Sequence, residues 1–137
     1  MKIRRLSPGE PLPSWVRALD ETTFGEAWGE LEPHEAMWML EEAAFARWSL
    51  VPAAAEGELL RIAVDPTHRG QGRAQTLLNA CEGELALLGI RELHLEVRAS
   101  NAAARALYLR SGWRKAGTRK HYYRDGEDAL LYAKPLG

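Results

Sequence analysis

The sequence predicts an α/β domain with a mixed β-sheet, and three consecutive segments carry this prediction. Residues 57–64 (GELLRIAV) are typical of a strand, residues 74–88 place apolar side chains at helical spacing, and residues 91–100 (RELHLEVRAS) alternate as another strand. Gly89 is a natural end for the helix. A helix that links two strands of one sheet requires parallel strands and a right-handed crossover.

The remaining segments add hairpins and helices around this unit. We expect a strand over 2–6, helical pieces within 11–36 broken near Gly25, Gly29 and Pro33, two strands within 37–50 around a turn at Glu41-Glu42, a helix over 100–112, and a hairpin over 118–136 with a type I′ turn at Asp125-Gly126. Hairpins on both sides of a parallel unit make the sheet mixed, with helices on both faces.

Strand alternation assigns side chains to faces. In the strand over 57–64, Leu60, Ile62 and Val64 share one face, and Leu59, Arg61 and Ala63 share the other. The helical stripe consists of Ala74, Leu77, Leu78, Cys81, Leu85 and Leu88. We therefore expect Cys81 in the core.

Length and composition suit one domain over residues 1–137. The chain has 46% hydrophobic residues, a single cysteine and no apolar run near the ~20 residues of a membrane span. A lone cysteine excludes an internal disulfide framework and favours a reducing cytoplasm. We expect a cytoplasmic protein with neither DNA nor a membrane as partner, and four dispersed histidines predict no metal site.

Charge is distributed unevenly along the chain. Residues 1–60 carry 5 Lys+Arg against 11 Asp+Glu, whereas residues 61–137 carry 13 against 8. The segment Ala18–Ala46 has eight acidic residues and no lysine or arginine. Two interpretations stay open: a solvated acidic face, or a two-sided site that takes an anion on the basic half and a cation on the acidic half.

A basic, glycine-bearing turn joins the strand over 57–64 to the next helix. The stretch RIAVDPTHRGQGRAQTLL places Gly70 and Gly72 beside Arg69 and Arg73, just before the helix. A helix N-terminus has unpaired amides and a positive dipole end, which suits phosphate, although turn chemistry alone also explains the glycines. The residues that follow Gly72 fit neither the P-loop nor the Rossmann pattern.

Together with the downstream stretch LHLEVRASNAAARALYLRSGW, this turn resembles the GNAT superfamily of acetyl-CoA-dependent N-acetyltransferases. The family's pyrophosphate loop, Gln/Arg-x-x-Gly-x-Gly/Ala, corresponds to residues 69–74. The stretch LEVRASNAAARALY, Tyr122-Tyr123 and EDALLYAKPL are most similar to bacterial enzymes that acetylate the N-terminal alanine of a small-subunit ribosomal protein. The resemblance implies an acetyl-CoA-binding core over 45–137, with acceptor-side helices and the first strands over 1–44.

The resemblance also implies which residues hold acetyl-CoA. The pyrophosphate would lie on the turn, and the pantetheine arm would run in a gap where the strand over 61–64 splays from the strand over 92–97. The implied cofactor-binding residues are Ile62, Ala63, Val64, Arg69, Gly70, Gln71, Gly72, Arg73, Ala74, Gln75 and Asn101. The amide of Val64 would polarise the thioester carbonyl. Asn101 also has a simpler role as a helix cap.

Two residues are implied as catalytic. Glu96 lies mid-strand on the face opposite Leu95, where a carboxylate is uncommon, and would act as the general base directly or through water. An ion pair with Arg98 is the structural alternative for Glu96, and His94 is an alternative base. Tyr108 would face the thioester sulfur, with a plain core tyrosine as its alternative.

The sequence thus predicts acetyl transfer to a primary amine, with a basic protein N-terminus as first choice. An α-amine has a pKa of about 8 and lysine about 10.4, so lysine costs about 3.3 kcal/mol more to deprotonate. Two alternatives stay open: a small cationic amine such as a polyamine or aminoglycoside as acceptor, and a non-catalytic acyl-CoA-binding module. The sequence predicts no oligomeric state.

Overall fold

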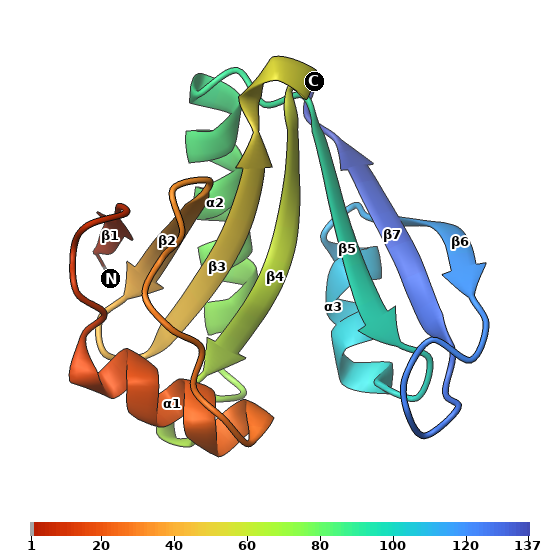
Figure 1. Cartoon of the computed structure of the whole chain (residues 1–137), viewed down its shortest axis with the longest axis horizontal. Helices are drawn as coiled ribbons and strands as arrows, with labels where there is room; N and C mark the ends of the chain where they lie inside the picture. Colours follow the sequence, from red (N-terminus) through yellow and green to blue (C-terminus); the bar gives the residue numbers. More distant parts are fainter. Residues whose placement is uncertain (1) are drawn as a thin grey trace.

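The computed structural model describes residues 2–137 as one seven-stranded sheet with three α-helices (Figure 1). The elements are β1 (Ile3–Leu6), α1 (Ser14–Phe24), β2 (Glu35–Leu40), β3 (Ala44–Val51), β4 (Glu56–Val64), α2 (Arg73–Leu87), β5 (Glu92–Arg98), α3 (Ala102–Arg110), β6 (Arg114–Arg119) and β7 (Ala129–Pro135).

The sheet is mixed, as the sequence predicts. Its strand order is β1-β2-β3-β4-β5-β7-β6. Strands β4 and β5 pair in parallel and are connected by α2, whereas the other neighbouring pairs are antiparallel. The parallel strand–helix–strand unit is therefore confirmed, with hairpins on both sides of it.

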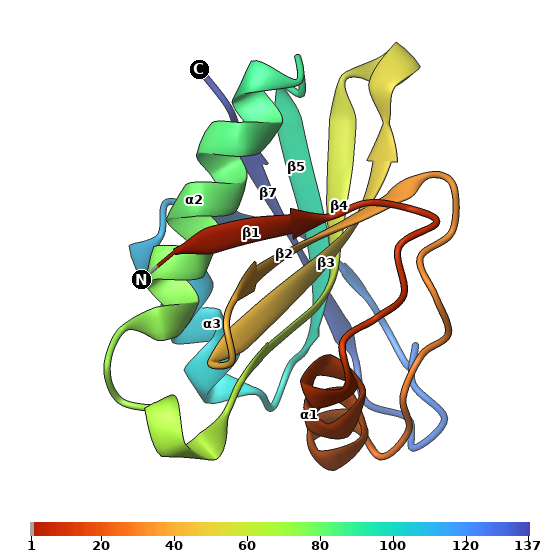
Figure 2. The same ribbon diagram turned by 90° about the vertical axis from the view of Figure 1, so that its left-hand side faces the viewer.

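Helices cover both faces of the sheet (Figure 2). Strand β2 shows the division, because Trp38 packs in the cluster that contains α2 and α3 residues, whereas Met37 and Met39 pack with Val16 and Leu19 of α1. We call these the α2 face and the α1 face. This alternation follows from the two-residue period of a strand.

A β-bulge at Leu60 changes the faces predicted for β4. Arg61 pairs with Arg47 and Leu59 pairs with Trp48, so Leu60 is an extra residue between them. Leu59 consequently lies in the α2-face core together with Ile62, and the prediction that placed these two residues on opposite faces is wrong. A bulge inserts one residue and bends the strand, which simple alternation does not anticipate.

The bulge coincides with the point where β4 and β5 separate. Their pairing runs from Glu56 with Glu92 to Leu59 with Leu95, and no pairing follows in the described part of either strand. Figure 1 shows the two strands joined at one end and diverging toward the other. Pairing therefore leaves one edge of β4 beyond Leu59 without a neighbouring strand.

Helix α2 packs through Leu77, Leu78, Cys81 and Leu85, which are all buried. Burial raises the pKa of the Cys81 thiol to about 12. Leu88, the last residue of the predicted stripe, follows the last helical residue and is 47% exposed. The helix unwinds at Gly89, whose φ of +88° favours glycine, as the sequence predicts.

The β6–β7 hairpin exists, but its connection is much longer than the predicted type I′ turn. Residues 120–128 link the strands as a loop held by acidic side chains. Arg98 donates to Asp125 and Glu127, and Glu127 also accepts the Ser100 amide at 2.7 Å. These longer-range bonds replace the tight pairing that Asp125-Gly126 predicts from local sequence.

Residues 2–137 contain no helix with the length and apolar character that crossing a membrane requires.

Candidate functional site

Half of the eight acidic residues in the segment Ala18–Ala46 form ion pairs with arginines from outside it. Asp20 pairs with Arg61 at 2.7 Å and Glu35 pairs with the buried Arg47 at 2.7 Å. Glu41 pairs with Arg4, and Glu30 with Arg17. A linear count of charges misses these partners because they arrive from neighbouring strands and helices.

Two of these arginines fix the chain that follows α1. Arg47 donates to the carbonyls of Gly29 and Glu30, and Arg61 donates to the carbonyl of Glu26. Both guanidinium groups lie over the ring of Trp28, Arg61 at 3.7 Å from its centroid. The irregular segment after Phe24 is thereby held on the α1 face beside β4.

The glycine turn lines a pocket of about 420 Å³ at the start of α2, which we call the turn pocket. Ten of the eleven residues implied to bind acetyl-CoA line it, namely Ile62, Ala63, Val64, Arg69, Gly70, Gly72, Arg73, Ala74, Gln75 and Asn101. Gln71 is exposed and does not line this pocket. The structure thus gathers residues from β4, α2 and the start of α3 around one hollow.

The backbone of the turn is open to a ligand. Gly70 and Gly72 have φ values of +75° and +72°, and a Cβ at either position would meet no atom within 4 Å. The buried Nε of Arg73 has no hydrogen-bonding partner among residues 2–137. Open backbone, a helix N-terminus and an unpaired guanidinium nitrogen fit an anionic group such as a pyrophosphate.

Strand β4 presents backbone groups to the gap beside it. The Asp65 amide donates to the Ala43 carbonyl, so alternation along an antiparallel ladder directs the backbone groups of Ala63 to β3 and those of Ile62 and Val64 to the open side. Arg69 Nε donates to the Val64 carbonyl at 3.1 Å. Ile62 and Val64, rather than Ala63, therefore offer amides along the gap.

Helix α3 supplies Asn101 and Tyr108. The Asn101 side chain accepts from the Ala104 amide at 3.1 Å, so it caps the helix as well as lining the turn pocket. Tyr108 is 6% exposed, packs against Trp113 and Tyr132, and also lines the turn pocket. Burial raises the pKa of Tyr108 to about 12.

Glu96 lies across the gap from Ile62. A second pocket of about 450 Å³, which we call the central pocket, contains Glu96 together with Ile62, Asn101 and Tyr108. The last three residues also line the turn pocket, so the two hollows adjoin. The structure thus brings Glu96 and Tyr108 to one cavity between β4 and β5.

The partner of Glu96 differs from the structural alternative given by the sequence. Arg119 of β6 approaches the Glu96 carboxylate at 3.6 Å, whereas Arg98 pairs with Asp125 and Glu127. The Glu96 side chain is 23% exposed and that of Arg119 is 55% exposed. His94 lies on the same strand face and approaches Glu92 at 3.8 Å.

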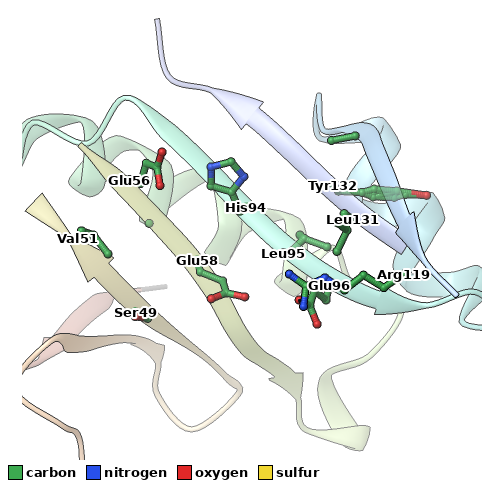
Figure 3. Close-up of a pocket in the computed structure, with 12 residues that line it drawn as sticks. Ser49, Val51, Glu56, Glu58, His94, Leu95, Glu96, Arg119, Leu131 and Tyr132 are labelled. Atoms are coloured by element: carbon green, nitrogen blue, oxygen red, sulfur yellow. The ribbon is translucent and has the colours of Figure 1, made fainter. Parts of the chain in front are cut away.

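A third pocket of about 400 Å³ extends from Glu96 along the α1 face, and we call it the distal pocket (Figure 3). Glu58 and Glu56 of β4 and His94 and Glu96 of β5 line it. The sequence missed Glu58, because unbroken alternation places it beside Leu60 and Ile62. A glutamate on that apolar strand face was the available signal for the bulge.

Glu56 and His94 of the distal pocket form a cluster with Glu92, and each of the three places a ligand-type atom within 4.8 Å of the others. Glu56 and Glu92 are register partners on β4 and β5. The spacing of histidines along the sequence does not predict this cluster, because its members come from two strands.

Comparison with known proteins identifies the family of the chain. Residues 2–113 match the model of the Acetyltransferase (GNAT) family. The ribosomal protein bS18-alanine N-acetyltransferase of Escherichia coli K12 is 48% identical over 84 residues, which cover 59% of this chain and 57% of that protein. An N-alpha-acetyltransferase of Saccharolobus solfataricus is 43% identical over 82 residues, covering 59% of this chain and 49% of that protein.

The matched region therefore spans about half the length of these curated relatives. The crystal structure of the ribosomal-protein-S18-alanine N-acetyltransferase from Escherichia coli matches 99% of this chain and 95% of that chain, at 32% identity and a TM-score of 0.78. Because the family model matches most of the residues, the chain belongs to the Acetyltransferase (GNAT) family.

Proposed function

We propose that this protein transfers the acetyl group of acetyl-CoA to a primary amine, with a protein N-terminal α-amine as the preferred acceptor. The observation that carries the proposal is the meeting of Glu96 and Tyr108 in the central pocket, which adjoins the turn pocket. A proton acceptor and a hydroxyl donor thereby lie beside a site suited to a pyrophosphate.

In this proposal the turn pocket holds the nucleotide end of acetyl-CoA. The amides from Gly70 to Gln75 and the side chains of Arg69 and Arg73 bind the pyrophosphate. The open backbone groups of Ile62 pair with the pantetheine arm, which supplies the acetyl thioester. The Val64 amide donates to the thioester carbonyl and stabilises negative charge on its oxygen.

Glu96 removes the proton from the acceptor. The amine nitrogen forms a bond to the carbonyl carbon, the carbon–sulfur bond breaks, and the proton of the amine passes to the Glu96 carboxylate directly or through one water. The ion pair with the exposed Arg119 keeps this carboxylate oriented at the edge of the central pocket. General-base assistance of this kind contributes about 10²–10⁴-fold.

Tyr108 assists the departure of sulfur as a hydrogen-bond donor. With its pKa raised to about 12, the phenol stays protonated at neutral pH. A thiol has a pKa of about 8.5, so complete proton transfer from Tyr108 to the thiolate would be uphill by about 5 kcal/mol. Burial therefore favours a hydrogen bond to the developing thiolate over finished acid catalysis.

An N-terminal acceptor is supported by chemistry and by the relatives. The matched Escherichia coli protein is named for an alanine of ribosomal protein bS18, and the Saccharolobus protein is named an N-alpha-acetyltransferase. An α-amine also loses its proton about 3.3 kcal/mol more easily than lysine. Both points favour a protein N-terminus.

Competition between acceptors tests this function. The protein is incubated with acetyl-CoA, an alanine-initiated basic peptide, the same peptide with a blocked N-terminus and an internal lysine, and spermidine. Mass spectrometry should find acetyl on the free α-amine of the first peptide. Modification of lysine or spermidine alone would overturn the acceptor, and CoA binding without release of free thiol would favour a non-catalytic module.

A further inference from the structure

We propose that Glu58 binds a second positive charge of the acceptor, in the distal pocket beyond the reacting amine. The proposal rests on the proposed function, because it takes Glu96 as the place where the amine reacts. It names the chemical class of acceptor as one with two cationic groups and identifies the residue that selects it.

The first argument is continuity between the pockets. Glu96 and Leu95 line both the central pocket and the distal pocket, so an acceptor that reaches Glu96 can extend into the distal pocket. Figure 3 shows the Glu58 carboxylate on the same side of the sheet as Glu96, on the neighbouring strand. An extended acceptor therefore passes Glu58 next.

The second argument is the distance between the two carboxylate positions. Glu58 pairs in register with His94, two residues before Glu96 on β5. A rise of about 3.3 Å per residue and a strand separation of about 4.8 Å place the two backbone positions roughly 8 Å apart. An arginine or lysine side chain near an N-terminus, or the next nitrogen of a polyamine, spans a comparable separation.

The third argument is that Glu58 lacks a partner. It is half-buried, and residues 2–137 provide it with no ion pair and no hydrogen bond, whereas Glu96 has Arg119. Burial, and then the charge of Glu96, raise the pKa of Glu58 by more than the nearby His94 and Arg119 lower it. A cationic group of the acceptor would offset both effects, because it supplies the missing partner of a partly desolvated carboxylate.

The charge of the residues that line the distal pocket also favours a cationic group. Three glutamates, Glu56, Glu58 and Glu96, line the distal pocket together with one arginine, Arg119. Arg119 already pairs with Glu96. Glu92 lies beside Glu56 and His94 and adds a further carboxylate next to the pocket. The pocket thus attracts a cation and disfavours an acidic side chain.

Binding measurements with matched peptides test the proposal without requiring turnover. Calorimetry in the presence of CoA compares alanine-initiated tetrapeptides that carry one arginine at position two or three with the same peptides carrying citrulline, the neutral analogue of similar shape. Spermidine and butylamine form the matched small-amine pair. We expect the wild-type protein to bind the cationic member of at least one pair about tenfold more tightly.

Glu58→Gln should reduce this preference to within about twofold, because it removes the charge and keeps the shape. Glu84→Gln is the control, since Glu84 is an exposed carboxylate on α2 outside all three pockets, and it should leave the preference unchanged. Glu58→Lys should reverse the preference, so that the variant binds peptides with glutamate at the same position more tightly than peptides with arginine. The peptide and amine pairs distinguish a protein acceptor from a small one.

A wild-type protein that binds arginine and citrulline peptides equally would overturn the inference, as would a preference that survives Glu58→Gln. Release of free thiol from acetyl-CoA by the wild-type protein, measured with the same peptides, tests the proposed function separately. A protein that binds cations through Glu58 without releasing thiol would refute only the transfer, and one that releases thiol without cation preference would refute only the role of Glu58.

Discussion

Gly72 combines two requirements, a left-handed backbone and an open approach to the helix N-terminus. Replacement by valine forces a β-branched residue to a φ of +72° and places a side chain where we expect the pyrophosphate. The variant should lose at least about 1–2 kcal/mol of stability through the backbone alone. Its affinity for CoA, measured by calorimetry, should fall at least tenfold.

Gly89 provides the matched control for this prediction. It has a φ of +88°, equal freedom from neighbours and a place at the opposite end of α2. Gly89→Val should therefore lose a similar amount of stability and keep its affinity for CoA. Equal affinity losses in the two variants would trace the effect to the fold rather than to the site.

Glu96 is the residue on which proton removal depends in our proposal. Glu96→Gln should keep CoA affinity and reduce kcat by about 10²–10⁴-fold. The deficit should shrink as pH rises toward the pKa of the acceptor, because a neutral amine needs no base. A pH–rate profile parallel to that of the wild-type protein would instead identify His94 or solvent as the proton acceptor.

Some residues of the candidate site can be identified from the sequence, whereas others can be identified only once the fold is known. The glycine turn follows from its motif, and the family resemblance implies Glu96 and Tyr108; the structure places all of them around adjoining pockets. The charge of the acidic segment cannot be predicted from the sequence, because Arg47 and Arg61 neutralise two of its acids from neighbouring strands. Glu58 was missed because one inserted residue moves it to the other face.

Among the elements, β4 has the greatest influence on the site, since its bulge coincides with the end of its pairing with β5. Deleting Leu60 would restore an unbroken ladder with β3 while leaving Leu59, Arg61 and Ile62 on their present faces. A bulge bends a strand and increases its twist. The deletion should therefore bring β4 back toward β5 and abolish CoA binding in a folded protein.

Calorimetry with CoA and urea unfolding together check this prediction. A shortened protein that unfolds cooperatively and no longer binds CoA would support the bulge as the origin of the gap. Retained CoA affinity would show that other contacts separate the strands. Deleting Ala53, in the exposed turn between β3 and β4, provides a control of equal length change.

Element types were predictable where the pattern was long and local. The hydrophobic periodicity and Gly89 predict the parallel unit and α2. Local sequence does not predict the loop after β6. Asp125-Gly126 is a strong local signal for a tight turn, yet Arg98 and the Ser100 amide hold the neighbouring acids in a longer loop. Contacts between distant segments overrode local preference at that point.

At the scale of the whole molecule, the buried thiol of Cys81 links stability to alkaline pH. The folded pKa of about 12 exceeds the ordinary value of 9.0, so the unfolded chain releases this proton first. The stabilisation is complete below about pH 9 and is lost as pH rises toward 12, at up to about 1.4 kcal/mol per pH unit. Cys81→Ala should remove this part of the decline.

Urea unfolding of both proteins at several pH values between 8 and 11 measures the difference. The Cys81→Ala protein should be less stable at pH 8, since it loses buried volume, and its stability should fall less steeply above pH 9. Parallel curves for the two proteins would contradict the assignment. Burial also raises the pKa of Tyr108, from 10.0 to about 12, but this contribution is common to both proteins.

The divergence of β4 from β5 has a consequence for exchange of amide hydrogens with solvent. Strands β4 and β5 pair at four positions at one end of the sheet. Beyond these pairs, the amides of Ile62 and Val64 face the gap between the two strands and have no partner strand. In the free protein these amides should exchange with deuterium rapidly although they lie near the middle of the sheet. A ligand whose own carbonyl and amide groups occupy that line would act as a substitute strand, and protection there would report its presence residue by residue.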